Sequence, residues 1–222
     1  MSEWPYREFY RRHLPHYQPP GATLFITFRL AGSLPKAVLE ELAAEAQRQE
    51  RRLEAIADEK ERAAQAERLA RHLFGRWDEA LHRRSNGPYD LQEPQVAALV
   101  AESLRYRDGR VYTLHAFCIM PNHVHLVCTP LPVVVEQVGR FGKSPYYPLA
   151  QILHSLKRYT AREANRLLGR TGPFWQHESY DHAVRDAAEL ERIIRYVVNN
   201  PVAAGLVKEA NEWPWTYVGQ FA

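Results

Sequence analysis

Two histidines separated by one residue, in an otherwise apolar run, have the clearest chemical use in this sequence. They are His123 and His125, in the segment MPNHVHLV (residues 120–127). On an extended strand, side chains two positions apart point to the same face, so the imidazoles would lie together while Val124 and Leu126 point into a core. Imidazole is a common ligand of divalent metals. The spacing alone leaves two interpretations open: half of a metal site, or a strand edge that happens to carry two histidines.

A further ligand and a nucleophile can be sought downstream, in the segment LERIIRYVVNNP (residues 190–201). Its apolar residues recur with the i, i+3, i+4, i+7 spacing of an amphipathic helix. Tyr196 falls off the centre of the apolar stripe, and Asn200 follows one helical turn later. Because proline disfavours helical geometry at the preceding residue, Asn200 is expected at or just past the helix end, before Pro201. Both side chains could face a neighbouring metal; alternatively, the tyrosine borders the core and Asn200 is only a cap.

Together these motifs resemble those of the single-tyrosine HUH transposases, and within them the REP-associated tyrosine transposases of bacteria. The resemblance rests on five segments in the same order: RRHLPHYQPPGATLFITF (11–28), PNHVHLV (121–127), FWQ (174–176), YDHAVR (180–185) and RYVVNNPVAAGLV (195–207). Several motifs in the right order are far more specific than any one of them. The resemblance covers most of the chain apart from roughly residues 36–95.

The resemblance implies a metal-dependent endonuclease and strand transferase that acts on single-stranded DNA hairpins of REP-like palindromes. Tyr196 would attack a phosphodiester, become joined to the 5′ phosphate and free a 3′ hydroxyl. A divalent metal held by His123, His125 and Asn200 would polarise the scissile phosphate. Both Mg²⁺ and Mn²⁺ are expected to work, and Mn²⁺ tolerates imidazole better. Only Tyr196, among the tyrosines, has the family's position five residues before the proline.

Basic residues in two regions are candidate DNA contacts: Lys157, Arg158 and Arg162 on a predicted helix, and Arg11 and Arg12 near the amino terminus. Tyr159 follows Lys157 and Arg158 on a helix that also bears Arg162, Arg166 and Arg170 at near-turn spacing. This combination suits a backbone clamp but is equally typical of a solvated face. The amino-terminal pair is suggested by resemblance, since relatives read bases that flank the hairpin with that region.

Composition is that of an ordinary globular protein, with 45% hydrophobic and 25% charged residues over 222 residues. A net charge of +3 permits a polyanionic partner without requiring one. Cys118 and Cys128 lack the paired spacing of a zinc site, and we expect them to be buried free thiols. Because no apolar run is long enough to span a bilayer, we expect no membrane partner, and free thiols favour the reducing cytoplasm. The resemblance implies a bacterial protein that is nucleoid-associated when bound to DNA.

The elements that position these residues follow from periodicity and breakers. Strands are predicted over 23–30, 111–120 and the histidine segment, and helices over 94–107 and 149–168. Residues 1–20 indicate an irregular basic arm. The expected fold is α+β: an antiparallel sheet covered by helices on one side. The resemblance implies its ferredoxin-like, or RRM-like, form as a single domain over residues 1–222.

A long helical insertion, about residues 36–85, departs from the simplest family members. Its helix formers run from Pro35 to about His82 and predict two helices, antiparallel, that break near Ala57 or Asp58. The insertion is either solvated surface or a partner-binding arm, so a monomer and a homodimer both remain open. Two other functions also remain open: a domesticated, non-catalytic nucleic-acid-binding protein of the same fold, and a metal-dependent hydrolase that uses water in place of Tyr196.

Overall fold

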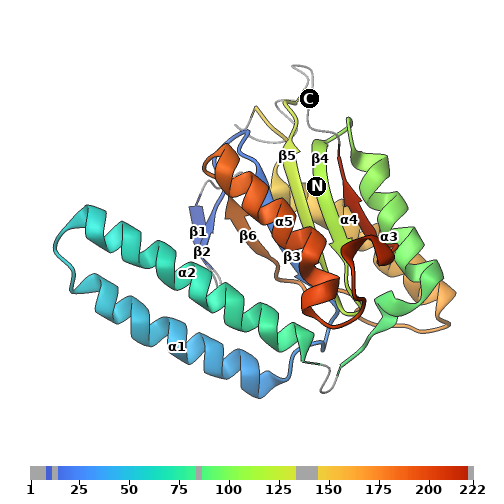
Figure 1. Cartoon of the computed structure of the whole chain (residues 1–222), viewed down its shortest axis with the longest axis horizontal. Helices are drawn as coiled ribbons and strands as arrows, with labels where there is room; N and C mark the ends of the chain where they lie inside the picture. Colours follow the sequence, from blue (N-terminus) through green and yellow to red (C-terminus); the bar gives the residue numbers. More distant parts are fainter. Residues whose placement is uncertain (1–8, 12–14, 84–86, 134–144, 220–222) are drawn as a thin grey trace. The chain divides into compact units, whose positions relative to one another are not determined.

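The computed structural model describes residues 9–11, 15–83, 87–133 and 145–219, with backbone alone over the parts of 9–17 included there. The chain divides into two compact units, one made of residues 1–31 and 89–222 and the other of residues 32–88 (Figure 1). The single domain over residues 1–222 that the sequence analysis expects stays a prediction.

The larger unit contains a five-stranded antiparallel sheet in the order β6-β3-β5-β4-β7. Its central elements follow one another as strand, helix, strand, strand, helix, strand: β3 (Leu24–Arg29), α3 (Pro94–Arg107), β4 (Tyr112–Ile119), β5 (His123–Pro130), α4 (Leu149–Leu167) and β6 (Tyr180–Ala183). This succession, with β3 and β5 in the centre, is the ferredoxin-like arrangement. The predicted α+β fold class is confirmed, and β7 (Thr216–Val218) extends the sheet beyond β4.

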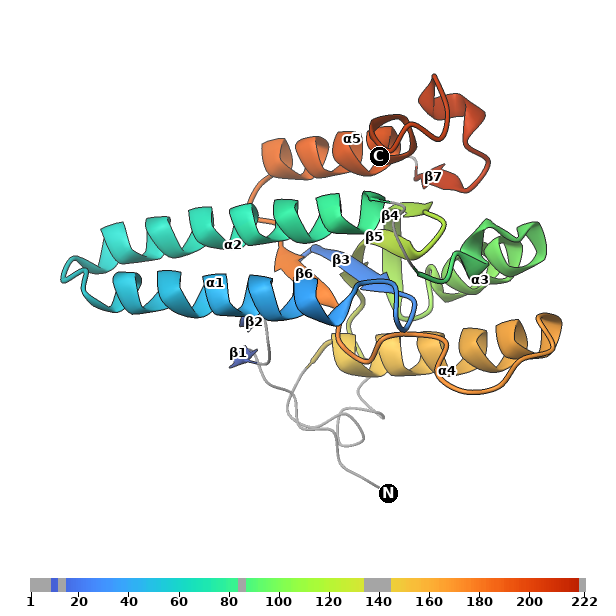
Figure 2. The same ribbon diagram turned by 90° about the horizontal axis from the view of Figure 1, so that it is seen from below.

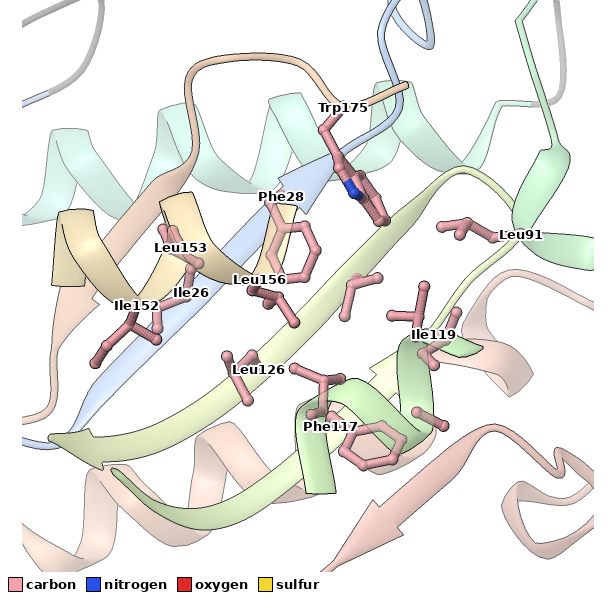
Figure 3. Packing of buried hydrophobic residues seen from close by; sticks show 14 of the residues in the cluster. Ile26, Phe28, Leu91, Phe117, Ile119, Leu126, Ile152, Leu153, Leu156 and Trp175 are labelled. Carbon is pink, nitrogen blue, oxygen red and sulfur yellow. The ribbon is translucent and has the colours of Figure 1, made fainter. Parts of the chain in front are cut away.

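One face of the sheet forms the main hydrophobic core against α3 and α4. Ile26 and Phe28 of β3 and Leu126 of β5 point to this face and are fully buried (Figure 3). The helices contribute residues such as Leu104 and Leu156, which are equally buried. Alternate positions of each strand therefore build this core, because strand side chains alternate between the two faces.

The opposite face of the sheet is covered by α5 (Ala187–Ala203), so helices lie on both sides and not on one side as expected (Figure 2). The helix begins at Asp186, whose carboxylate accepts a hydrogen bond from the Glu189 backbone N–H at 2.7 Å. The expectation that the helix ends near Asn200 was wrong. Pro201 lies inside the last turn, where the missing N–H removes only one intrahelical bond.

Termination of α5 comes after Ala203, through a glycine in the left-handed region. Gly205 has φ of 67°. Its N–H donates to the carbonyl of Val202 at 2.9 Å, and the N–H of Leu206 donates to the carbonyl of Pro201 at 2.9 Å. This pair of bonds is the Schellman motif, which closes the free carbonyls of a helix end.

The smaller unit is the predicted helical pair, α1 (Lys36–Glu54) and α2 (Glu59–His82), which run antiparallel (Figure 1). The chain breaks at residues 55–58, as predicted, and Asp58 caps α2 by accepting from the Glu61 N–H at 2.7 Å. Ion pairs join the two helices, including Arg76 to Glu41 at 2.9 Å.

The amino-terminal segment is not wholly irregular, in contrast to the expectation. It forms a two-stranded antiparallel ribbon of β1 (Phe9–Arg11) and β2 (Pro15–Tyr17). Two short 3₁₀ helices, η1 (Asp90–Gln92) and η3 (Ala210–Glu212), complete the described elements. Among the helices of the described ranges, none combines the length and the apolar character needed to cross a membrane.

Candidate functional site

The two histidines lie side by side on the α5-facing side of the sheet, as the sequence predicted. Their rings are 4.7 Å apart between centroids, and their Nε2 atoms are 3.1 Å apart. Both residues are almost completely buried. The strand alternation of β5 sends Val124 and Leu126 into the opposite core.

Each imidazole is held at its other nitrogen by a neighbouring polar side chain. The Nδ1 of His123 donates to the Oδ1 of Asn122 at 2.7 Å, and the Nδ1 of His125 lies 2.8 Å from the Oγ1 of Thr27. A proton on each Nδ1 leaves the lone pairs of both Nε2 atoms facing each other, which is repulsive unless a cation binds between them or one nitrogen takes a proton. Anchored imidazoles with converging Nε2 atoms are the donor set of a metal site, so these residues fit a divalent ion.

The ring of Tyr196, on α5, lies against His125 of this pair. Its ring centroid is 5.5 Å from that of His125 and 5.9 Å from that of Phe25, in edge-on contacts with both. Phe25 in turn stacks on His125 at 5.7 Å. The tyrosine is half-buried, so its helix places the phenol beside the histidines while leaving part of the side chain exposed. The predicted proximity of Tyr196 to the histidine pair is therefore present in the structure.

Asn200 is buried in the last turn of α5, one turn beyond Tyr196. Its place on the helix agrees with the sequence expectation, apart from the helix end discussed above. Its part as the third metal ligand stays a prediction.

The start of α5 is fixed to β6 by a buried carboxylate. Glu189 accepts hydrogen bonds from the Arg185 backbone N–H at 2.9 Å and from the Arg185 guanidinium at 2.7 and 2.9 Å. The Nε2 of His182 on β6 lies 3.3 Å from the same carboxylate. These hydrogen bonds, those from the Arg185 side chain above all, lower the pKa of Glu189 to about 2. The helix that carries Tyr196 is thereby anchored at its first turn.

The predicted basic stripe on α4 does not form one surface. Lys157 turns inward: its ammonium donates to the carbonyls of Gln176 and His177 at 3.0 and 3.2 Å. Arg162 is exposed and pairs with Glu163 at 2.8 Å. Arg158 is exposed and lines a groove of about 380 Å³ between α4 and residues 172–179. Lys157 therefore has a structural role that the spacing did not reveal.

DNA contact by the basic residues stays a prediction. The structure describes only the backbone of Arg11, and Arg12 lies outside the described residues. Trp175 packs against Phe28, with ring centroids 4.9 Å apart, and donates from its indole nitrogen to the Thr160 hydroxyl at 2.8 Å.

Sequence reasoning missed the polar residues that surround the histidines. Thr27 and Arg29 occupy alternate positions of the strand LFITFR, and they lie opposite His125 and His123 in the sheet register. Because these polar residues alternate with apolar residues in the strand, the sequence could have indicated that they face away from the core. The strand pairing needed to connect them with the histidines is not visible in one sequence.

Comparison with known proteins gives two curated relatives. A protein of Haemophilus influenzae named putative REP-associated tyrosine transposase is 29% identical over 102 residues, which cover 46% of this chain and 56% of that protein. The Escherichia coli REP-associated tyrosine transposase is 24% identical over 144 residues, 64% of this chain and 75% of that protein. The resemblance to REP-associated tyrosine transposases is confirmed.

The match to the Haemophilus influenzae relative spans little more than half of that relative's length. The solved structure of a REP-associated tyrosine transposase bound to a REP hairpin is similar with a TM-score of 0.47 and 19% identity, over 97% of this chain and 82% of that chain. No family model matches the chain.

Proposed function

We propose that this chain is a metal-dependent endonuclease and strand transferase for single-stranded DNA that acts on palindromic repeat hairpins. The observation that carries the proposal is the placement of the Tyr196 ring over His125, in a histidine pair whose Nε2 atoms converge. The names of the two curated relatives support the same reaction class.

In the proposed reaction the phenolic oxygen of Tyr196 attacks the scissile phosphorus. A bond forms between the phenolic oxygen and phosphorus, the bond from phosphorus to the 3′ oxygen breaks, and the released 3′ oxygen takes up a proton while the phenol loses one. The product is a 5′-phosphotyrosine and a free 3′ hydroxyl. In the reverse step a 3′ hydroxyl attacks the phosphotyrosine. The bond between phosphorus and the 3′ oxygen forms, the bond to the tyrosine oxygen breaks, and two DNA strands are joined.

His123, His125 and Asn200 are the proposed ligands of a Mg²⁺ or Mn²⁺ ion, which when bound would polarise a non-bridging oxygen of the scissile phosphate. Asn122 and Thr27 hold the two imidazoles at Nδ1, which would leave the Nε2 atoms available to bind that ion. The edge-on contact with Phe25 holds the tyrosine ring beside the pair. A cytoplasmic setting agrees with this activity, and the scheme is compatible with a monomer or a homodimer.

The test is a denaturing gel of the protein incubated with labelled single-stranded hairpin DNA and Mn²⁺. The hairpins come from repeats that flank its own gene. We expect a covalent protein–DNA band that disappears with a chelator and in Tyr196→Phe. Tyr159→Phe, a change to an exposed tyrosine on α4, is the matched control and should keep the band.

Two results would contradict the proposal. Cleavage without a covalent band would indicate water as the nucleophile and a metal-dependent hydrolase. Binding of hairpin DNA with neither cleavage nor adduct, by a protein that binds Mn²⁺, would indicate a domesticated nucleic-acid-binding protein.

A further inference from the structure

Arg29 is a buried cation beside the histidine pair, and the scheme above gives it no role. It lies on the same face of β3 as Phe25 and Thr27, and it is the register partner of His123. The 2.8 Å hydrogen bond between the Thr27 hydroxyl and the Nδ1 of His125 shows that side chains on this face of β3 reach those of β5. Directly opposite residues on antiparallel strands have Cβ atoms about 4.5–5.5 Å apart, so the long arginine side chain can reach the space in front of His123.

The guanidinium keeps its positive charge in spite of burial. Arg29 is 4% exposed. Loss of solvation lowers its pKa to about 10, an effect that the negative charge of Glu178 partly opposes. Arg29 therefore remains a cation at neutral pH. Because a buried charge costs stability, such residues gather where a site needs the charge.

Glu178 lies in the segment that leads into β6 at Tyr180, on the side of β3 away from β5. Its negative charge reaches Arg29, since it raises the pKa of the guanidinium. The Gln176 N–H donates to the Arg29 carbonyl at 2.8 Å, which shows that this segment runs alongside β3 beyond the end of β6. Arg29 thus has His123 of β5 on one side and the segment that carries Glu178 on the other.

We propose that Arg29 is a catalytic residue whose guanidinium binds a non-bridging oxygen of the scissile phosphate, and that Glu178 is a positioning residue that holds the guanidinium. Attack on a phosphodiester concentrates negative charge on the oxygens around phosphorus, and a fixed cation in a dry site stabilises that charge most. A planar guanidinium suits two phosphate oxygens at once. This inference rests on the proposed function for the reaction that Arg29 serves.

The competing explanation is an ion pair between Arg29 and Glu178 that only supports the fold. A structural pair predicts loss of stability on substitution, with activity falling only as far as the folded fraction does. A phosphate-binding arginine predicts a slower chemical step in protein that is fully folded and still binds the metal.

The first experiment measures single-turnover adduct formation with saturating hairpin DNA, together with Mn²⁺ affinity by EPR in the absence of DNA. We expect Arg29→Gln to slow adduct formation about 100-fold, because it removes a donor that stabilises the negative charge of the transition state. Arg29→Lys keeps the charge but not the planar guanidinium, so we expect it to slow the reaction about 10-fold. Glu178→Gln should slow it less. Mn²⁺ affinity and the folded fraction should stay unchanged. Arg107→Gln is the matched control, because burial also lowers the pKa of Arg107. Arg107 lies on α3, where its guanidinium donates to the hydroxyls of Ser103 and Ser155.

A second experiment measures binding to DNA, without turnover, in a Tyr196→Phe background. The scissile phosphodiester is compared with a methylphosphonate, in which a neutral methyl group replaces one charged oxygen. We expect Arg29→Gln to weaken binding of the phosphodiester about tenfold and to leave binding of the methylphosphonate unchanged.

The inference would be overturned by an adduct rate within twofold of the parent protein, by a rate loss matched in Arg107→Gln, or by equal loss of binding to both DNAs. Absence of an adduct from the parent protein would instead overturn the proposed function. The comparison of phosphodiester and methylphosphonate still tests the contact with phosphate in that case.

Discussion

The two faces of the central sheet come from the same strands but bury different kinds of side chain. Toward α3 and α4, strands β3 and β5 present only apolar residues: Leu24, Ile26, Phe28, Val124, Leu126 and Cys128. Toward α5, the intervening positions include four buried polar residues: Thr27, Arg29, His123 and His125. The first face can contribute hydrophobic free energy, whereas the second carries groups that are costly to bury unless they are paired.

One strand can therefore serve stability on one face and chemistry on the other, because its side chains alternate between the two faces. A histidine on β5 is adjacent in sequence to a core residue and yet faces the opposite layer. Substitutions on the two faces should therefore separate: those facing α5 should change activity more than stability, and those facing α3 and α4 should do the reverse.

The largest expected effect is on the chemical face. His125→Gln removes one of the two anchored imidazoles, and we expect adduct formation to fall about 10³-fold because charge stabilisation at the phosphate is lost. Single-turnover assays and Mn²⁺ titration measure the effect. His115→Gln is the control. His115 of β4 bonds to Thr129, which lies near the end of β5 that is away from His123 and His125. If a His125 variant retained a tenth of the parent rate or more, the role of this face in the chemistry would be contradicted.

The core face should respond in the opposite sense. Leu126 is adjacent to His125 in sequence but faces the opposite core. Because Leu126→Ala leaves a cavity in that core, we expect it to lower the free energy of unfolding by about 2–5 kcal/mol. Denaturant unfolding measures this loss. The rate of adduct formation per folded molecule should stay within about threefold of the parent. A loss of rate without a loss of stability would show that the two faces are not separate.

A smaller effect should come from the side chain that anchors His125. Thr27→Val removes the hydroxyl bonded to Nδ1, and we expect Mn²⁺ affinity to fall about 10–100-fold because the imidazole loses its fixed orientation. Thr23→Val removes a comparable hydroxyl, bonded to Thr129, just before the same strand begins. Equal effects of the two substitutions on Mn²⁺ affinity would contradict the anchoring role.

The smallest effect concerns the anchor of α5. The folded state lowers the pKa of Glu189 from 4.5 to about 2, so the ionised carboxylate stabilises the fold above about pH 4.5. That contribution is lost as the pH falls from 4.5 toward 2, where the carboxylate protonates in the folded state. Because Arg185 is partly exposed, we expect only about 1–2 kcal/mol.

Unfolding of Glu189→Gln as a function of pH measures this contribution. The variant should be less stable than the parent at pH 7, and the difference should narrow between pH 4.5 and 2. A difference that is constant over that range would contradict the role of the ionised carboxylate. Adduct formation per folded molecule should change little.

The sequence predicted the parts of the site that depend on local periodicity. The spacing of His123 and His125 determined their shared face, since strand side chains alternate whatever the partner strand is. The helical projection brought Tyr196 and Asn200 to one side of α5, and the breakers near Asp58 divided the insertion into two helices.

The remaining features depend on tertiary context. The register of β3 against β5, which sets Thr27 and Arg29 opposite the histidines, has no local signal. Pro201 was expected to end the helix, but burial and the cap at Gly205 let the last turn form around it. Lys157 was grouped with exposed neighbours because spacing does not reveal that its ammonium bonds to the carbonyls of residues 176 and 177.

Mass spectrometry of the covalent adduct tests directly whether Tyr196 is the nucleophile of a site built on the histidine pair. The protein is incubated with hairpin DNA and Mn²⁺, the DNA is trimmed with nuclease, and the protein is digested with trypsin. We predict a nucleotide remnant on Tyr196, in the peptide that ends at Lys208. A remnant on another tyrosine, such as Tyr180 or Tyr159, would contradict the account.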